Sequence, residues 1–160
     1  MAILRNVRED DYPQVIRVLN DWWGGRKVAD MLPRLFFIHF SDTSYVVEDE
    51  GVVVAFLVGL FSQSRRGEAY IHFIAVDPRH RGKGLGRQLH EKFFAEASAR
   101  GGMSVRSVTS PLNAASVAFH RRMGFEIEKS DTTIHGYPAV KDYDGPGADR
   151  VCLVKHLGSK

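Results

Sequence analysis

A cluster of glycines and cations between residues 79 and 87 has the composition of a binding site for an anion. The glycines are Gly82, Gly84 and Gly86, and the basic residues beside them are Arg79, Arg81, Lys83 and Arg87. Glycines let backbone N–H groups approach a ligand, and a helix N-terminus adds partial positive charge to that of the side chains. An apolar segment precedes the cluster and an amphipathic segment follows it. We therefore expect a phosphate or pyrophosphate site between a strand and a helix.

Two common phosphate-binding loops do not match this stretch. A P-loop requires Ser or Thr after its lysine, whereas Lys83 is followed by Gly84. The dinucleotide-binding fingerprint requires a third glycine at the place where this sequence has Arg87. The alternative to an anion site is a glycine-rich turn with a solvated basic face.

A second group of polar residues lies in a segment that reads as a helix, from residue 113 to residue 124. Asn113, Ser116 and His120 are three and four residues apart and therefore share one helix face. The opposite, apolar stripe is expected to consist of Ala115, Ala118, Phe119 and Met123. The polar face would then project toward a polar partner. The alternative is that Asn113 is only a helix cap, Ser116 a filler and His120 a surface residue.

The stretch from Arg81 to Gly86 resembles the loop that binds the pyrophosphate of acetyl-CoA in the GNAT superfamily of acyl-CoA N-acyltransferases. The family pattern is Gln or Arg, two residues of any type, Gly, one residue of any type, and Gly or Ala. Arg81, Gly84 and Gly86 match that pattern.

The helix that follows residue 112 resembles a later helix of the same family. The residues in register with its motif are Asn113, Ser116, Phe119, His120, Gly124 and Phe125. Most members have Tyr where this chain has His120, and a His there is similar to the phosphinothricin-acetyltransferase-like branch. The order of elements also resembles the family along essentially the whole chain, which implies a single N-acetyltransferase domain over residues 1–160.

The resemblance implies transfer of an acetyl group from acetyl-CoA to a primary amine in a ternary complex, without an acyl-enzyme and without a metal ion. It also implies that backbone groups of the strand before the glycines bind the pantetheine arm, and that the N–H of Val76 stabilises the oxyanion. The residues expected to bind acetyl-CoA are Ile74, Ala75, Val76, Arg81, Gly82, Lys83, Gly84, Leu85, Gly86, Arg87, Asn113, Ser116 and His120.

Two histidines are the candidates for proton transfer. Side chains alternate along a strand, so His72 shares a face with Tyr70 and Val76 and would lie near the arriving amine. We expect His72 to be the base, with Glu68 in reserve; the alternative is a hydrogen-bonded structural histidine. His120 is expected to help the thiolate leave, but only modestly, because an unshifted imidazole is mostly neutral above pH 7.

The acceptor site is expected to come from the first two helices, their link, and the loop before the last strand. Trp22 and Trp23 could wall a pocket, and Arg26 could hold a carboxylate. The residues expected to bind the acceptor are Trp22, Trp23, Arg26, Tyr70 and Tyr143, and Asp142 and Asp144 could attract a cationic amine. The alternatives are tryptophans in the core at a helix end and a turn at Asp144. We expect a small-molecule amine in preference to a protein.

The composition is that of an ordinary soluble domain. The 160 residues are 44% hydrophobic and 26% charged, with a formal net charge of +3. That charge permits an anionic ligand without requiring nucleic acid, and the longest apolar run is too short to span a bilayer. A lone cysteine, Cys152, cannot form an internal disulfide, so we expect a cytoplasmic protein. We expect no membrane partner, and no nucleic-acid partner because the basic residues are not interleaved with aromatic ones and 19 acidic residues are spread over the chain. The sequence leaves open whether the protein forms a homodimer. Two alternative functions also remain: an acyl-CoA-binding regulator without transfer, and a nucleic-acid-binding module.

The chemistry-bearing residues would be positioned by alternating strands and helices. Strands are expected at 2–7, 68–76, 103–109, 125–130 and 150–157, with a hairpin over 44–61, and helices at 10–24, 28–40, 85–100 and 113–123. Residues 136–149 are expected to be a loop rich in Gly, Pro and Asp. This order predicts an α/β, three-layer domain. The resemblance implies the GNAT fold, a mixed and mostly antiparallel sheet with splayed central strands and helices on both faces.

Overall fold

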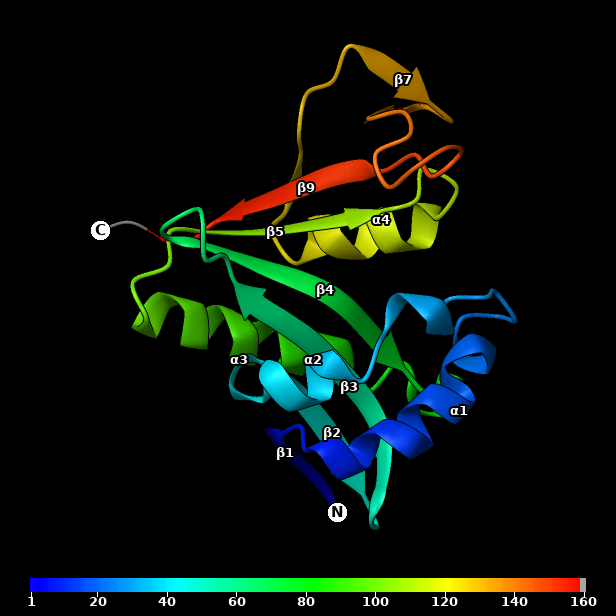
Figure 1. Cartoon of the computed structure of the whole chain (residues 1–160), viewed down its shortest axis with the longest axis vertical. Coiled ribbons are helices and arrows are strands. Elements are labelled where there is room, and N and C mark those ends of the chain that lie inside the picture. The colour runs from blue at the N-terminus through cyan, green and yellow to red at the C-terminus, as the bar shows by residue number, and fades with distance from the viewer. Residues whose placement is uncertain (159–160) are drawn as a thin grey trace.

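Seven strands form one sheet in the computed structural model, which describes residues 1–158 (Figure 1). The strand order is β1-β2-β3-β4-β5-β9-β6, and within the described chain every pairing in this sheet is antiparallel except that of β4 with β5. The strands are β1 (Ala2–Asn6), β2 (Tyr45–Asp49), β3 (Val52–Phe61), β4 (Glu68–Val76), β5 (Ser104–Thr109), β6 (Glu126–Ile127) and β9 (Val151–His156). The predicted mixed, mostly antiparallel sheet is confirmed.

Helices cover both faces of the sheet. The α-helices are α1 (Tyr12–Trp22), α2 (Leu35–His39), α3 (Leu85–Ala99) and α4 (Ala114–Arg122). The short 3-10 helices are η1 (Glu9–Asp11), η2 (Ala29–Met31), η3 (Ser41–Thr43) and η4 (Pro78–His80). Apolar side chains of α1 and α2 form one core with the sheet, and those of α3 and α4 form another. The predicted three-layer architecture is therefore confirmed.

The hairpin of β2 and β3 explains the long apolar run in the sequence. Its turn is made by Glu50 and Gly51, whose φ angles of +52° and +79° are those of a two-residue turn that matches the strand twist. Residues 53–58 of β3 are buried, because helices cover the strand from both sides. The run is thus a central strand of the sheet.

Two predicted segments differ in the structure. The helical run expected over 28–40 is broken into η2 and the five-residue α2, with Pro33 between them. The loop expected over 136–149 contains β8 (Tyr137–Ala139), which pairs with β7 (Thr132–Ile134) in a separate hairpin, seen at the top of Figure 1. The hairpin turns at His135 and Gly136, which both have positive φ. Strands of three residues carry too little alternation to be read from sequence.

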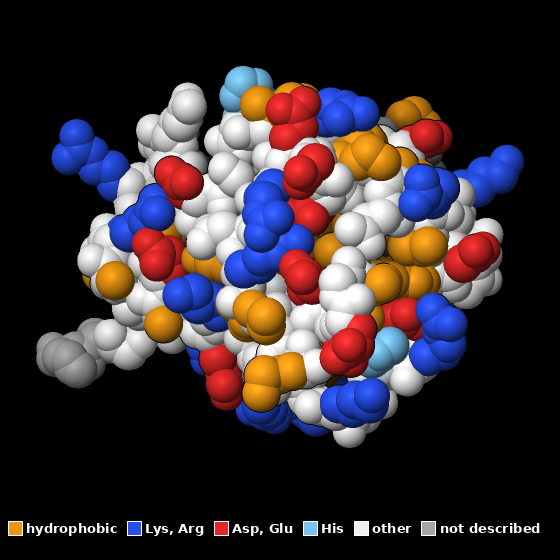
Figure 2. Space-filling view, turned by 90° about the horizontal axis from the view of Figure 1, so that it is seen from below, with side chains coloured by type: hydrophobic (Ala, Val, Ile, Leu, Met, Phe, Trp, Pro, Cys, Tyr) orange, Lys and Arg blue, Asp and Glu red, His pale blue; other side chains and the backbone are white. Residues whose placement is uncertain are grey.

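Positive and negative side chains are mixed on the face of the molecule that Figure 2 shows. Lys and Arg side chains lie interspersed with Asp and Glu, and apolar side chains are scattered among them. Within residues 1–158, none of the helices combines the length and the apolar character needed to cross a membrane.

Candidate active site

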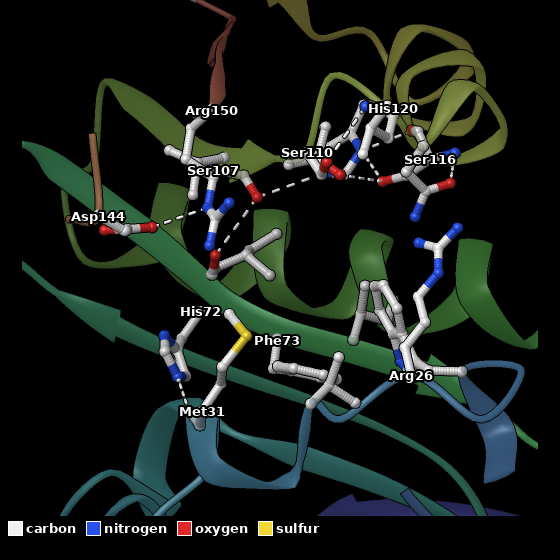
Figure 3. Close-up of a pocket in the computed structure, with 18 of the residues that line it drawn as sticks. Arg26, Met31, His72, Phe73, Ser107, Ser110, Ser116, His120, Asp144 and Arg150 are labelled. Carbon is white, nitrogen blue, oxygen red and sulfur yellow. Dashed lines mark hydrogen bonds and ion pairs between the residues drawn. The ribbon is translucent and has the colours of Figure 1, made fainter. Parts of the chain in front are cut away.

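A slot opens where β4 and β5 separate. The two strands pair at three positions only, Glu68 with Ser104, Ala69 with Val105 and Tyr70 with Arg106. Just beyond the last pair, the hydroxyl of Ser107 donates to the carbonyl of Ile71 at 3.4 Å. A cavity of about 420 Å³ follows, lined by residues 71–74 of β4 and 107–110 of β5 and its following loop (Figure 3). The predicted splaying of the central strands is confirmed.

The edge of β4 presents backbone groups to this slot. The N–H of Asp77 donates to the carbonyl of Val54 on β3, at 2.8 Å. Because backbone groups alternate in direction along a strand, those of Val76 and Ile74 point away from β3, toward the slot. This direction is the one that the predicted oxyanion role of Val76 requires. The same alternation turns the N–H and C=O of Ala75 toward β3, so its predicted backbone contact with acetyl-CoA is not supported.

The cluster of glycines and cations at residues 79–87, here called the glycine corner, has the geometry of a helix N-terminus that is open to a ligand. Gly82 and Gly84 both have φ of +80°, a conformation that side chains disfavour, and Gly84 is the N-cap of α3. The first N–H groups of α3 have no acceptor four residues earlier within the helix. A Cβ at Gly82 or Gly84 would meet nothing within 4 Å. The corner therefore leaves backbone donors accessible beside Lys83 and Arg87.

Gly86 and Arg81 connect the corner to the rest of the site. A Cβ at Gly86 would lie 3.1 Å from the Cζ of Phe119, so glycine allows α3 to approach α4 closely. The guanidinium of Arg81 donates from Nη2 to the carbonyl of Trp22, at the end of α1, at 2.8 Å. The corner is thus in contact with α4, which borders the cavity, and with the C-terminal end of α1, directly before the cavity residue Trp23.

The N-terminal half of α4 brings polar groups to the cavity. Asn113 caps the helix, its Oδ1 accepting from the N–H of Ser116 at 3.1 Å, and the hydroxyls of Ser116 and Thr109 are 2.9 Å apart. Both Asn113 and Ser116 also line the cavity. The expected apolar stripe on the far side is wrong in part, because Ala115 and Ala118 are exposed. The buried residues of the helix are Val117 and His120, while Asn113 and Ser116 are half-buried.

His120 is held inside the protein with only 4% of its surface exposed, so the alternative of a surface histidine is wrong. Its Nδ1 lies 2.8 Å from the carbonyl of Ser116, which can only accept, so Nδ1 carries the proton. Its Nε2 lies 3.3 Å from the hydroxyl of Ser107. Burial lowers the pKa of His120, although the bond to Ser116 opposes that shift. The imidazole is therefore neutral at pH 7.

His72 faces the cavity and is fixed by two contacts. Its Nε2 donates to the carbonyl of Met31 at 2.5 Å, and its ring stacks on Phe36 with centroids 4.3 Å apart. Because a carbonyl can only accept, this hydrogen bond places the proton on Nε2. The lone pair of Nδ1 is then able to accept a proton. Glu68 does not line the cavity: its carboxylate pairs with Arg106 at 2.9 Å at the start of β4. That ion pair argues against Glu68 as a reserve base.

Some of the residues predicted to bind the acceptor line the cavity, and others do not. Trp23, Arg26 and Tyr70 line the cavity. Burial raises the pKa of Tyr70 to about 12, so its hydroxyl stays protonated. Trp22 is 6% exposed and packs against Phe56 in the core, so the prediction that it walls the pocket is wrong.

The loop before β9 contributes one residue that was expected from sequence, Asp144, and one that was not, Arg150. Tyr143 is 47% exposed and neither it nor Asp142 is among the cavity residues, which does not support the prediction for Tyr143. Asp144 does line the cavity, together with Arg150, which the sequence did not indicate. The Nε of Arg150 donates to Oδ2 of Asp144 at 2.8 Å.

Comparison with known families decides the class of protein. Residues 4–125 match the model of the acetyltransferase (GNAT) family. The chain belongs to the GNAT acetyltransferase family. Its membership confirms the predicted family and makes the chain an acetyltransferase.

Characterised relatives and solved structures agree with this assignment. An L-2,4-diaminobutyric acid acetyltransferase from Nocardia farcinica is 26% identical over 136 residues, which are 80% of this acetyltransferase and 68% of the relative. An L-methionine sulfoximine/L-methionine sulfone acetyltransferase from Salmonella typhimurium is 34% identical over 84 residues, 51% of this chain and 49% of the relative. The structure of yncA from Salmonella typhimurium, solved with its cofactor acetyl-CoA, superposes with a TM-score of 0.72 at 21% identity, covering 100% of this chain and 96% of that one. At this identity the structural likeness shows the fold.

A second buried histidine of the acetyltransferase, His90 on α3, was not found from sequence. It is fully buried, its Nδ1 donates to the carbonyl of Gly86 at 2.9 Å, and its Nε2 has no hydrogen-bond partner within residues 1–158. Its ring lies edge-on to that of His120, with centroids 6.3 Å apart. The signal was its spacing of three and seven residues from Phe93 and Ala97, which puts it on the buried face of α3.

Acidification should destabilise this acetyltransferase through His90. Burial lowers the pKa of His90 from 6.5 to about 4, so between these values the unfolded chain binds a proton that the folded chain does not. Stability is therefore present above pH 6.5 and is lost as the pH falls toward 4, by up to about 3 kcal/mol. Urea unfolding at pH 7.5 and pH 4.5 measures the loss. His90→Leu should reduce the loss, and the exposed control His39→Leu should keep it. Equal losses in wild type and His90→Leu would contradict this assignment.

Proposed function

We propose that this acetyltransferase moves an acetyl group from acetyl-CoA to a primary amine of a small molecule, by direct attack in a ternary complex. The observation that carries the proposal is the slot between β4 and β5, with backbone donors on one edge and a cavity beside it. The glycine corner adjoins this slot, because Gly86 lies against Phe119 on α4 and α4 borders the cavity.

Acetyl-CoA fits the groups that the corner and the slot present. Its pyrophosphate would be bound by the first N–H groups of α3 and by the side chains of Arg81 and Lys83. The amide groups of its pantetheine arm would pair with the outward-facing backbone of Ile74 and Val76. Asn113 and Ser116 would border the arm from α4. When bound, acetyl-CoA supplies the activated acetyl group.

The chemistry requires a neutral amine, a donor for the oxyanion and a stable leaving thiolate. His72 takes the amine proton at Nδ1, directly or through water, because Nε2 is already engaged with Met31. The N–H of Val76 donates to the oxyanion. His120 is neutral and its Nδ1–H is engaged with Ser116, so its help to the leaving thiolate is small. Solvent would then supply most of the protonation.

A small-molecule acceptor is favoured by the dimensions of the site and by the relatives. The cavity of about 420 Å³ is bordered by Trp23, Met31 and Tyr70, which leaves room for a metabolite. The relatives described above are named for 2,4-diaminobutyric acid and for methionine sulfoximine or sulfone, which are small amino acids. A cytoplasmic setting is consistent with the single, free Cys152.

An amine panel with acetyl-CoA tests the proposal. Wild-type protein should release free CoA thiol only when an acceptor such as L-2,4-diaminobutyrate or L-methionine sulfone is present, with the acetylated product seen by mass spectrometry. His72→Ala should lower turnover most at pH values below the pKa of the acceptor amine, where a base is needed. The control is His39→Ala, on an exposed position of α2.

Two results would contradict the proposal. Tight binding of acetyl-CoA without amine-dependent thiol release would support the acyl-CoA-binding regulator instead. An equal loss of turnover by His72→Ala at every pH would assign His72 a structural role through its contacts with Met31 and Phe36.

A further inference from the structure

Arg150 is held rigidly in the wall of the cavity. It directly precedes β9, and its backbone bridges to Val140 at the end of the preceding hairpin. Its side chain is only 18% exposed. Nε donates to the carboxylate of Asp144 at 2.8 Å, and Nη1 donates to the carbonyl of Asp149 at 2.9 Å. These two bonds fix the plane of the guanidinium.

The same bonds leave one edge of the guanidinium free for a ligand. Arginine has five N–H donors, of which Asp144 and Asp149 take two. The remaining three are one N–H of Nη1 and both of Nη2, which form the fork that matches the two oxygens of a carboxylate. Figure 3 shows the guanidinium directed from its anchor near Asp144 into the cavity, on the side of His72.

We propose that Arg150 binds the carboxylate of the acceptor, so that the acceptor is an amino acid or a close derivative. This inference rests on the proposed function and specifies its substrate class. A carboxylate on the free edge of Arg150 would bring the amine of a short amino acid toward His72. A planar monoanion suits this edge better than a phosphate dianion, because the carboxylate of Asp144 lies beside it and repels added negative charge.

Asp144 is a positioning residue in this arrangement. Its side chain is 44% exposed and touches the guanidinium only at Nε, which orients the fork without occupying it. Arg26, which the sequence suggested for a carboxylate, lies toward Ser116 in Figure 3, whereas Arg150 lies toward Asp144 and His72. The two arginines therefore offer different places for the same group, and the experiment distinguishes them.

Matched acceptors with and without the carboxylate test the inference. L-2,4-diaminobutyrate is compared with 1,3-diaminopropane, and L-methionine sulfone with its carboxamide, using acetyl-CoA and thiol release. Wild type should prefer the acids by roughly 10- to 100-fold in kcat/KM, the effect of a bidentate charged hydrogen bond. Arg150→Gln should bring that ratio close to one, and Arg150→Lys, which keeps the charge without the fork, should give an intermediate ratio. The control Arg66→Gln, in the exposed turn before β4, should keep the wild-type ratio. Ratios relative to wild type cancel the differences in amine pKa between the acceptors.

Each other outcome overturns the inference in a recognisable way. An acid preference that survives Arg150→Gln and disappears in Arg26→Gln would assign the carboxylate to Arg26. Equal use of acids and their uncharged partners by wild type would exclude a carboxylate site. Absence of thiol release with every amine in wild type would instead refute the proposed function, before any variant is compared. If Arg150→Gln does not fold, a wild-type ratio in Arg150→Lys overturns the role of the fork.

Discussion

Replacing Gly84 with glutamate should lower the affinity for acetyl-CoA by at least about 100-fold, the effect of losing charged hydrogen bonds and adding a like charge. Gly84 is the N-cap of α3, with φ of +80° and open space where its Cβ would be. A glutamate there places its carboxylate at the N–H groups that would receive the pyrophosphate. Isothermal titration calorimetry with acetyl-CoA measures the loss.

Gly101 provides a matched control on the same helix. It follows the C-terminal end of α3, has φ of +83°, and would also meet nothing within 4 Å on gaining a Cβ. Gly101→Glu therefore carries the same left-handed strain, roughly 1–2 kcal/mol, without a charge at the corner. It should bind acetyl-CoA as wild type does. Equal affinity of folded Gly84→Glu and Gly101→Glu would place the pyrophosphate elsewhere.

Phe93→Ala should destabilise the protein by about 3–5 kcal/mol, the usual cost of emptying a buried aromatic site. Phe93 is fully buried on α3 and packs edge-on against Phe61 at the end of β3, with centroids 6.2 Å apart. Its ring also fills the space above Gly59: a Cβ at Gly59 would overlap the ring and lie 2.8 Å from its Cζ. Urea unfolding at pH 7.5 gives the change in the free energy of unfolding.

A double-mutant cycle shows whether the two residues share this space. Gly59→Ala alone should cost about 1–3 kcal/mol, because the added methyl collides with a closely packed ring. In the Phe93→Ala background the same methyl enters the vacated volume, so its cost should disappear or reverse. Additive effects of the two substitutions would contradict the packing.

Much of the fold could be predicted from local pattern. The strand at 68–76 alternates along its length, the hairpin at 44–61 carries its turn residues, and the helix at 85–99 repeats its apolar residues every three or four positions. The glycine corner could be predicted as an anion site because its glycines lie in the sequence directly between a strand and a helix. These signals arise within a few residues of chain, where sequence determines conformation directly.

The remaining parts of the site depend on contacts between distant segments. Arg150 lines the cavity with its guanidinium held by Asp144 and by the carbonyl of Asp149. Trp22 is in the core, while Trp23, one residue later, lines the cavity, since α1 ends between them and the next side chain points elsewhere. His120 is buried because α4 turns its polar face inward toward Ser107. Spacing along α4 predicted that His120 shares a face with Asn113 and Ser116, but the partner that each side chain meets depends on how distant segments fold together.

The early end of the pairing between β4 and β5 has a thermodynamic consequence. After Tyr70 the sheet continues as two panels, β1 to β4 and β5 with β9 and β6, that share no further rungs. A cosubstrate arm lying in that gap would pair with the edge of β4 in the manner of an inserted strand. Binding of acetyl-CoA in the slot would then hold the two parts of the sheet together. The amide hydrogens of Ile74 and Val76 would exchange with solvent more slowly in the protein with acetyl-CoA bound than in the free protein. Substrate binding and the cohesion of the sheet would thus depend on the same few peptide groups.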